Sequence, residues 1–411
     1  MSIFGGEFLK WFDKMVNTAT NKKYVEFIKG EDLDGEPSLS GVYVSEENAM
    51  TVSGVFACVR VIAEDVASLP FALYKRLDKG KEKAFDHPLY YLIHDSPNSE
   101  MSAFSFKESM LTNLLLWGNA YAQIIRAKNG HIHSLHPLLS SRMIVSKNTD
   151  GSRIFNYTND KGITTKLRRE QIFHVAGISY DGLIGLSPIG IAREAVGLAK
   201  VTEIYGNKFF ANGARPGGVL EHPGQIKDPE RVRKSWESVY KGAQNSHKIA
   251  VLEEGMKYHD IGVPQKDAQF LETRQFQLNE ICRIFRVPPH LVGDLSKATF
   301  SNIEHQSIDY VVHTLRPWLV RFEQAVNLQL LNELEREEYF SKFNVDGLLR
   351  GAFSTRMNGY AVGRQNGWYS ANDIRELEDM NPIPAEQGGD EYLVNGNMIT
   401  AANAAKGGGE N

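Results

Sequence analysis

The stretch from Ser187 to Leu331 most constrains what this chain can fold into, because it predicts three helices separated by an insertion and a short loop. The first helix begins at Ser187-Pro188, where serine caps well and proline lacks an N–H that the first turn does not need. Pro288-Pro289 ends the second helix, and the spacing Ser301–Glu304 predicts a capping box for the third. Inside the third helix, Pro317 removes a backbone hydrogen bond and should kink the helix. This order favours two remote helices that run side by side, and it is not typical of a catalytic scaffold.

The composition limits the classes of function that need to be considered. The formal net charge of −4 over 411 residues excludes a global basic field, which argues against a protein that coats DNA but is compatible with a conduit through which DNA slides. Cys58 and Cys282 are the only cysteines, so a disulfide scaffold and a cysteine-based zinc site are excluded, and a reducing cytoplasm fits. We find no secretory signal and no run of eighteen apolar residues.

The two ends of the chain carry weaker signals. Apolar residues recur at helical spacing in Met1–Met15, where only Lys10 and Lys14 are cationic. We therefore expect a helix that packs on a partner subunit, with a membrane-surface helix as the alternative. Residues 16–50 are polar and are expected to be loosely structured, and residues 406–411 predict a flexible tail.

Residues 50–186 predict a compact α+β domain. Asn129-Gly130 and Asp150-Gly151 are turn signals for two β-hairpins. Apolar spacing indicates helices at 52–68, 87–94 and 104–117, and alternation indicates strands at 69–76, 120–127, 131–138, 142–147, 153–158 and 171–176.

The insertion and the C-terminal part also predict ordered elements. Asp228-Pro229-Glu230 opens a helix that runs to Tyr240, and strands at 249–252 and 257–262 are joined by Glu254-Gly255. The insertion is therefore expected to be a small αβ module. After Phe343, two shorter helices are expected at 355–366 and 370–380.

Candidate catalytic and metal-binding patterns have simpler explanations. His131, His133 and His136 do not share one strand face with a nearby carboxylate, so a surface hairpin is favoured over a metal site. The segment around Ser187 resembles a nucleophile elbow but lacks its last glycine, so a serine hydrolase stays an alternative only. No GxxxxGK[ST] motif occurs, and Lys297 alone reads as a solvated loop cation.

Several short motifs together resemble the portal proteins of long-tailed siphophages and related prophages. Each motif is weak alone, but their order and spacing over residues 45–385 are highly specific. The motifs are Ala57-Cys58-Val59-Arg60-Val61-Ile62-Ala63, Ala67-Ser68-Leu69-Pro70, His87-Pro88-Leu89-Tyr90, Gly118-Asn119-Ala120-Tyr121-Ala122, Gly182-Leu183-Ile184-Gly185-Leu186-Ser187-Pro188-Ile189, Asn212-Gly213-Ala214, Phe270-Leu271-Glu272, Phe285-Arg286-Val287-Pro288-Pro289 and Arg316-Pro317-Trp318-Leu319.

This resemblance implies the portal fold, in which about twelve subunits form a ring around an axial channel. The implied parts are an N-terminal extension (1–49), a wing (50–186), a first stem helix (187–214), a clip (215–266), a second stem helix (267–288), a tunnel loop (289–300), a long helix kinked at Pro317 (301–340), and a C-terminal wing with a short crown and tail (341–411).

The resemblance also implies a non-enzymatic function without cofactor or metal. The ring would occupy one capsid vertex of the virion after assembly in the host cytoplasm. Its expected partners are double-stranded DNA bound without sequence specificity, the terminase large subunit, the head-completion or adaptor protein, and the major capsid protein and scaffold. The expected channel residues of the tunnel loop are His290, Asp294, Lys297, Thr299 and Asn302, and the expected docking residues of the clip are Arg231, Arg233, Lys234 and Glu237.

Overall fold

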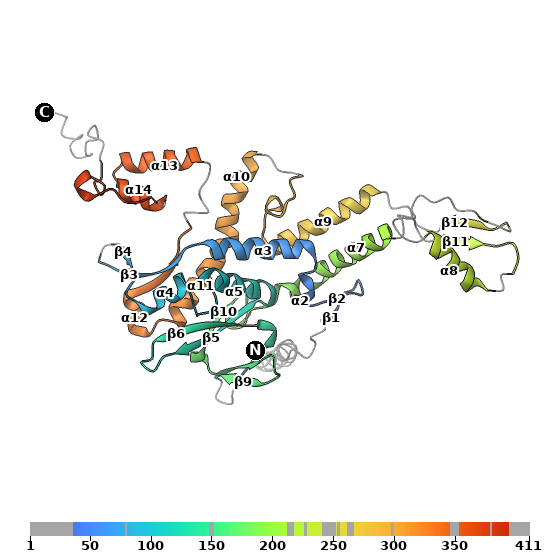
Figure 1. Cartoon of the computed structure of the whole chain (residues 1–411), viewed down its shortest axis with the longest axis horizontal. Helices are drawn as coiled ribbons and strands as arrows, with labels where there is room; N and C mark the ends of the chain where they lie inside the picture. The colour runs from blue at the N-terminus through green and yellow to red at the C-terminus, as the bar shows by residue number, and fades with distance from the viewer. Residues whose placement is uncertain are drawn as a thin grey trace, which may run out of the picture. The chain divides into compact units, whose positions relative to one another are not determined.

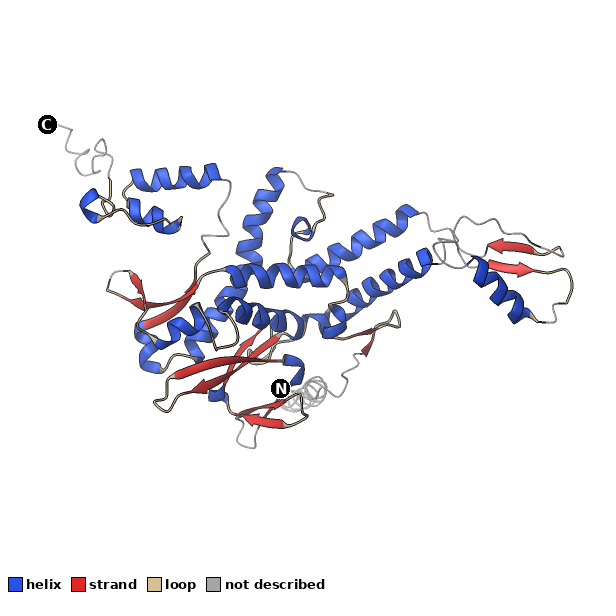
Figure 2. Ribbon diagram, in the orientation of Figure 1, coloured by secondary structure: helices blue, strands red, loops and turns tan. Residues whose placement is uncertain are grey.

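The computed structural model describes residues 36–78, 80–147, 152–211, 218–225, 228–240, 252, 255–260, 267–296, 300–345, 353–378 and 380–393. It divides into two compact units, Met1–Asn344 and Val345–Asn411, and each is considered by itself. Helices and strands alternate through the first unit, and all its described strand pairs are antiparallel (Figure 2).

The central sheet of the first unit has the order β10-β5-β6, with strands Ile172–Ala176, Asn119–Arg126 and Ile132–Leu138. The predicted hairpin at Asn129-Gly130 is confirmed, and Gly130 adopts a φ of 86° that a side chain would disfavour. Helices α3 (Ser53–Ser68) and α5 (Ala103–Trp117) pack against each other beside this sheet (Figure 1).

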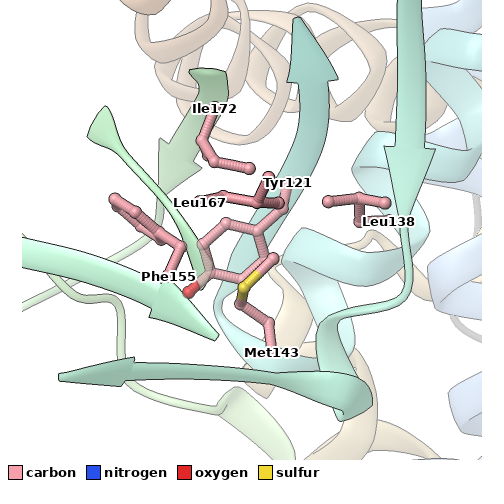
Figure 3. Close-up of a cluster of buried hydrophobic side chains, with 6 residues drawn as sticks. All are labelled: Tyr121, Leu138, Met143, Phe155, Leu167 and Ile172. Atoms are coloured by element: carbon pink, nitrogen blue, oxygen red, sulfur yellow. The ribbon is translucent and has the colours of Figure 1, made fainter. Parts of the chain in front are cut away.

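A second sheet, β7-β8-β9, completes the core next to the central one. Its strands are Met143–Lys147, Arg153–Thr158 and Thr164–Leu167, and the last of them was not predicted. The 3₁₀ turns η1 (Ser140–Arg142) and η2 (Arg169–Gln171) connect the two sheets. Buried side chains from both sheets meet between them (Figure 3), namely Tyr121, Leu138, Met143, Phe155, Leu167 and Ile172.

The third sheet pairs a strand at the C-terminal end of the first unit with a strand from its N-terminal part. Its order is β13-β3-β4, with strands Tyr339–Phe343, Phe71–Arg76 and Lys81–Lys83, and only β3 was predicted. Helices α4 (Pro88–His94) and α12 (Glu333–Glu338) contact β3. Stacking of Phe71 on Phe343, with ring centroids 4.1 Å apart, holds the late strand against the early one.

Residues 36–50 are more ordered than the sequence suggested. Strands β1 (Glu36–Pro37) and β2 (Tyr43–Val44) form a ribbon, and the short helix α2 (Glu46–Ala49) follows a capping box at Ser45. The expectation of loose structure over residues 16–50 is therefore wrong for the described part. The ribbon gains order by packing on α7, where Gly197 leaves room that a Cβ would deny to Ser38.

The two remote helices pack side by side as predicted. Ser187 caps α6 (Pro188–Ile191), whose end at Ala192 separates it from α7 (Arg193–Ala211), so the expected single helix is interrupted there. Helix α9 (Asp267–Phe285) runs alongside α7 and also packs against α3 (Figure 1).

The insertion contains α8 (Pro229–Tyr240), which confirms the predicted helix. Strand β12 (Lys257–Asp260) pairs with β11 (Gly218–Glu221). The sequence did not predict β11, because it begins at the end of a glycine-rich segment. The predicted strand partner at 249–252 lies, except for Leu252, outside the described residues.

The third predicted helix consists of three segments. These are α10 (Phe300–Asp309), the π-helical segment η5 (Tyr310–Leu315) and α11 (Arg316–Gln329). Ser301 lies inside α10, so its assignment as the capping residue is wrong; the helix begins at Phe300, two residues before the Asn302 that a cap at Ser301 implies. Before α10, residues Pro289–Val292 form the 3₁₀ turn η4.

The second unit contains α13 (Phe353–Gln365), α14 (Ala371–Leu377) and the 3₁₀ turn η6 (Ala385–Gln387). Both predicted helices are confirmed, and Ser370 caps α14 through a reciprocal pair with Asp373. Met1–Met15 and residues 406–411 lie outside the described residues.

Candidate functional site

The segment that leaves α9 begins at a tight corner. Arg286 has a φ of 56°, and the N–H of Val287 donates to the Cys282 carbonyl at 2.9 Å while that of Arg286 donates to Arg283 at 3.3 Å. This pattern is a Schellman cap, in which the left-handed position is usually glycine. Pro288-Pro289 then directs the chain away from the helix.

Side chains tie this segment to the helices on both sides. Gln275 Nε2 donates to Ser296 Oγ at 2.6 Å and to Asp294 Oδ2 at 3.3 Å, while His290 Nδ1 lies 3.0 Å from Gln306 Oε1. Of the residues expected in a tunnel loop, His290 and Asp294 therefore serve bonds within the chain. Lys297 and Thr299 lie outside the described residues, and Asn302 is in α10 with its side chain not described.

The π-helical segment is fixed at two points. Tyr310 donates its phenol proton to Asp65 Oδ2 at 2.8 Å, and Thr314 Oγ1 donates to the Arg286 carbonyl at 2.5 Å. Burial raises the pKa of both Tyr310 and Asp65. Pro317 lies in the first turn of α11, directly after this segment. The kink at Pro317 stays a prediction.

Three of the predicted docking residues lie exposed on α8. Arg231, Arg233 and Lys234 are solvent-accessible, and Arg233 pairs with Glu230 one turn earlier at 3.0 Å. The side chain of Glu237, also in α8, is not described. The exposed first turns of the helix therefore carry three cations, of which Arg233 is paired with a carboxylate.

A buried polar cluster, which the sequence did not reveal, holds the segment that leads into α6 and α7. We call this cluster the buried polar joint. Asn119 accepts from the Gly185 N–H and donates to the Gly185 carbonyl, both at 2.8 Å, and its Oδ1 lies 3.0 Å from His174 Nε2. Because both bonds to Gly185 fix the orientation of the amide, His174 donates from Nε2. Burial lowers the pKa of His174 to about 3, with further lowering by Arg169 and Arg153. A Cβ on Gly118 or Gly185 would overlap backbone atoms here, which explains these glycines.

Ser187 belongs to this joint and is not a nucleophile. Its hydroxyl accepts from the Gly190 N–H at 2.9 Å and donates to Glu46 and to the Leu116 carbonyl, so it caps α6 while buried. His136 bonds to Ser134 on its own strand, and no three His, Cys, Asp or Glu side chains of the described residues are placed to hold a metal.

The outer half of the α7–α9 pair exposes large apolar side chains. This surface, called the distal patch below, consists of Ile204, Tyr205, Leu271 and Phe276. None of the helices in the described ranges has the length and apolar character needed to cross a bilayer.

Comparisons with known proteins agree with this architecture. The family described as phage portal protein matches residues 53–379. The probable portal protein of Streptomyces phage phiC31 is 38% identical over 376 residues, covering 88% of this chain and 81% of that protein, and the portal protein of Enterobacteria phage HK97 is 34% identical over 354 residues, covering 84% and 82%. A chain in the neck of a native gene transfer agent particle, computed with C12 symmetry, has a TM-score of 0.56 at 24% identity and covers 82% of this chain and 93% of its own.

Helices α7 and α9 pack side by side with the insertion of residues 215–266 between them, and antiparallel sheets with further helices form the rest of the unit. This architecture is typical of a structural rather than a catalytic class of protein. The chain belongs to the phage portal protein family. It is a non-enzymatic component of a bacteriophage virion.

Proposed function

We propose that about twelve copies of this portal protein form a ring around an axial channel for double-stranded DNA. The observation that carries the proposal is the distal patch: although α9 also packs on α3 and α7 on β2, the side chains of Ile204, Tyr205, Leu271 and Phe276 stay exposed. In a cyclic ring each copy meets a neighbour on both sides, which covers such a patch. The C12 symmetry applied to the gene transfer agent neck supports this number of copies.

We assign the parts of the ring as the family resemblance implies. The sheets and helices of residues 50–186 form the wing, α7 and α9 the stem, residues 215–266 the clip, and residues 289–300 the tunnel loop. Residues 301–340 form the long helix behind the loop, and residues 341–411 the C-terminal wing, short crown and tail. Residues 1–49 are assigned as an N-terminal extension.

The ring occupies one capsid vertex and helps to start assembly with the major capsid protein and scaffold. It docks the terminase large subunit while DNA enters, retains the genome, and then receives the head-completion protein and tail for ejection. Its channel contacts must be weak and independent of sequence, because tight binding would stall a sliding polymer. The net charge of −4 suits this requirement.

The tunnel loop is proposed as the narrowest part of the channel. His290 bonds to Gln306 of α10 and Asp294 to Gln275 of α9. Lys297, Thr299 and Asn302 are assigned to the channel because the family resemblance implies it. Lys297→Ala should assemble normally and change the rate or completeness of packaging. Crosslinking from position 297 to packaged DNA tests the assignment directly; a failure there, while a probe on the outer surface of the ring reacts, would place the constriction elsewhere.

The exposed face of α8 is proposed as the docking surface of the clip. Arg233→Glu combined with Lys234→Glu should leave the ring intact and weaken terminase or adaptor binding, because it reverses two exposed charges. Lys161→Glu with Lys166→Glu, exposed in and beside the β8–β9 turn, is a matched control for the change in total charge. Equal binding by the two double variants would remove the clip from the docking surface.

The ring itself is tested by native mass spectrometry of the assembled protein, with negative-stain images viewed down the axis. A particle of about twelve chains with a central hole is expected. A stable monomer or dimer at high protein concentration would contradict the proposed function.

A further inference from the structure

Arg286 adopts a backbone conformation that its side chain disfavours. Among the described residues it is the only non-glycine with a positive φ. It occupies the position after the end of α9 where glycine is the usual residue, because a Cβ there crowds the following carbonyl. Arginine at this corner therefore costs folding stability that glycine would not.

The surrounding bonds hold this corner rigidly. The Schellman bonds from Arg286 and Val287 close it on the α9 side, and Thr314 Oγ1 donates to the Arg286 carbonyl from the π-helical segment. Pro288 and Pro289 restrict the residues that follow. The backbone of Arg286, and with it the direction in which its side chain leaves the chain, is thus fixed at the start of the segment between α9 and α10.

Neither packing nor pairing within the chain explains the guanidinium. Arg286 is solvent-exposed, and within the described ranges its side chain makes no ion pair or hydrogen bond. Arg283, three residues earlier, differs in that it pairs with Glu280. What arginine adds at position 286, relative to glycine, is a positive charge with several donors.

We propose that Arg286 binds phosphate groups of double-stranded DNA inside the ring. This inference rests on the proposed function, because it needs the channel. A guanidinium contacts a phosphate in a bidentate manner without reading the base, and its planar fork is already organised for this geometry. The ring repeats the charge once per subunit, so the DNA meets a circle of equivalent weak contacts. Arginine occupies this position although glycine would avoid the backbone strain, and the phosphate contact would explain that choice.

The test compares assembled rings of the wild-type chain, Arg286→Gly, Arg286→Lys and the control Arg126→Gln. Arg126 is an equally exposed arginine on the β5–β6 hairpin. Each ring is titrated with a short double-stranded DNA fragment at several salt concentrations. Arg286→Gly should raise the unfolding midpoint of the monomer and still form rings. It should also reduce the slope of log binding constant against log salt concentration by about one for each lost phosphate contact. Arg286→Lys should keep most of the slope, and Arg126→Gln all of it.

Three results overturn the inference in different ways. An unchanged slope for Arg286→Gly would show that this side chain does not contact phosphate. Loss of the ring in Arg286→Gly, with a folded monomer, would assign the guanidinium to an acidic group of the neighbouring copy. Wild-type chains that form no ring, or rings that bind no DNA, would contradict the proposed function itself, and the wild-type arm separates that failure from the others.

Discussion

The two halves of α9 differ in what covers their apolar side chains. In the inner half, Phe285 is only 6% exposed, and α3 comes so close that a Cβ on Gly54 would lie 3.1 Å from Leu278. In the outer half, Leu271 is 64% and Phe276 57% exposed. The apolar side chains of the inner half of α9 are therefore buried by the chain itself, whereas those of the outer half would be buried only by another molecule. The proposed ring would supply that surface, because a cyclic assembly places a neighbouring copy on each side.

The largest expected effect comes from replacing the same residue type in each half. Phe285→Ala should lower the free energy of unfolding of the monomer by about 3–5 kcal/mol, because it leaves a cavity in the inner half. Phe276→Ala should change it by no more than about 0.5 kcal/mol, yet reduce the fraction of assembled ring. Denaturant unfolding below the assembly concentration measures the first quantity, and native mass spectrometry the second. Equal losses of monomer stability would remove the distinction between the halves.

A second test uses the buried polar joint. Because the pKa of His174 is about 3 in the folded chain and near 6.5 when unfolded, the unfolded chain alone takes up a proton between these values. Stability should therefore fall as the pH drops below 6.5, by up to about 1.4 kcal/mol per pH unit. His174→Gln should remove this contribution, so that the difference between variant and wild type shrinks with acidity. A difference that is constant from pH 7 to about 4 would show that the joint does not hold His174 neutral.

A smaller effect is expected from charge reversal beside the distal patch. Lys208 at the end of α7 and Glu272 near the start of α9 are exposed and oppositely charged. In the proposed ring, these two helices would face neighbouring copies. Lys208→Glu should lower ring formation at low salt by about 0.2–1 kcal/mol per contact, and Glu272→Lys in the same chain should restore it. Lys166→Glu is the control on the wing. If the double variant assembles no better than Lys208→Glu, another face of the stem makes the contact.

Only a small change in stability is expected at Pro317. The proline ring clashes with an α-helical carbonyl four residues earlier, and the wider π-helical segment before α11 relieves that clash. Pro317→Ala should allow regular α-helix, change the free energy of unfolding by less than about 1 kcal/mol, and shift the direction of α10 and the loop it carries. A high-resolution map of the variant ring with an unchanged helix axis would contradict the kink.

The elements that the sequence predicted well are those with local signals. Ser187-Pro188, Ser370 and the glycine of the Asn129-Gly130 turn act through bonds or backbone angles within a few residues, and the structure has them in those roles. The α7–α9 pairing was also expected, because breakers at both ends defined the helices. The candidate site was predicted less well, since His290 and Asp294 bond within the chain and the strain at Arg286 has no signature in its residue type.

By itself, the sequence determined most of the longer helices, the two predicted hairpins and the absence of a global basic charge, because each follows from short-range patterning or from composition. The family followed from the order and spacing of motifs that resemble it. Only the tertiary structure decided that β13 pairs with β3, that β11 pairs with β12, and that Tyr310 and Thr314 anchor the π-helical segment to Asp65 and Arg286. Those contacts join residues far apart in the chain. Their contribution to stability depends on the packing of segments that are distant in sequence, and no local pattern of residues predicts that packing.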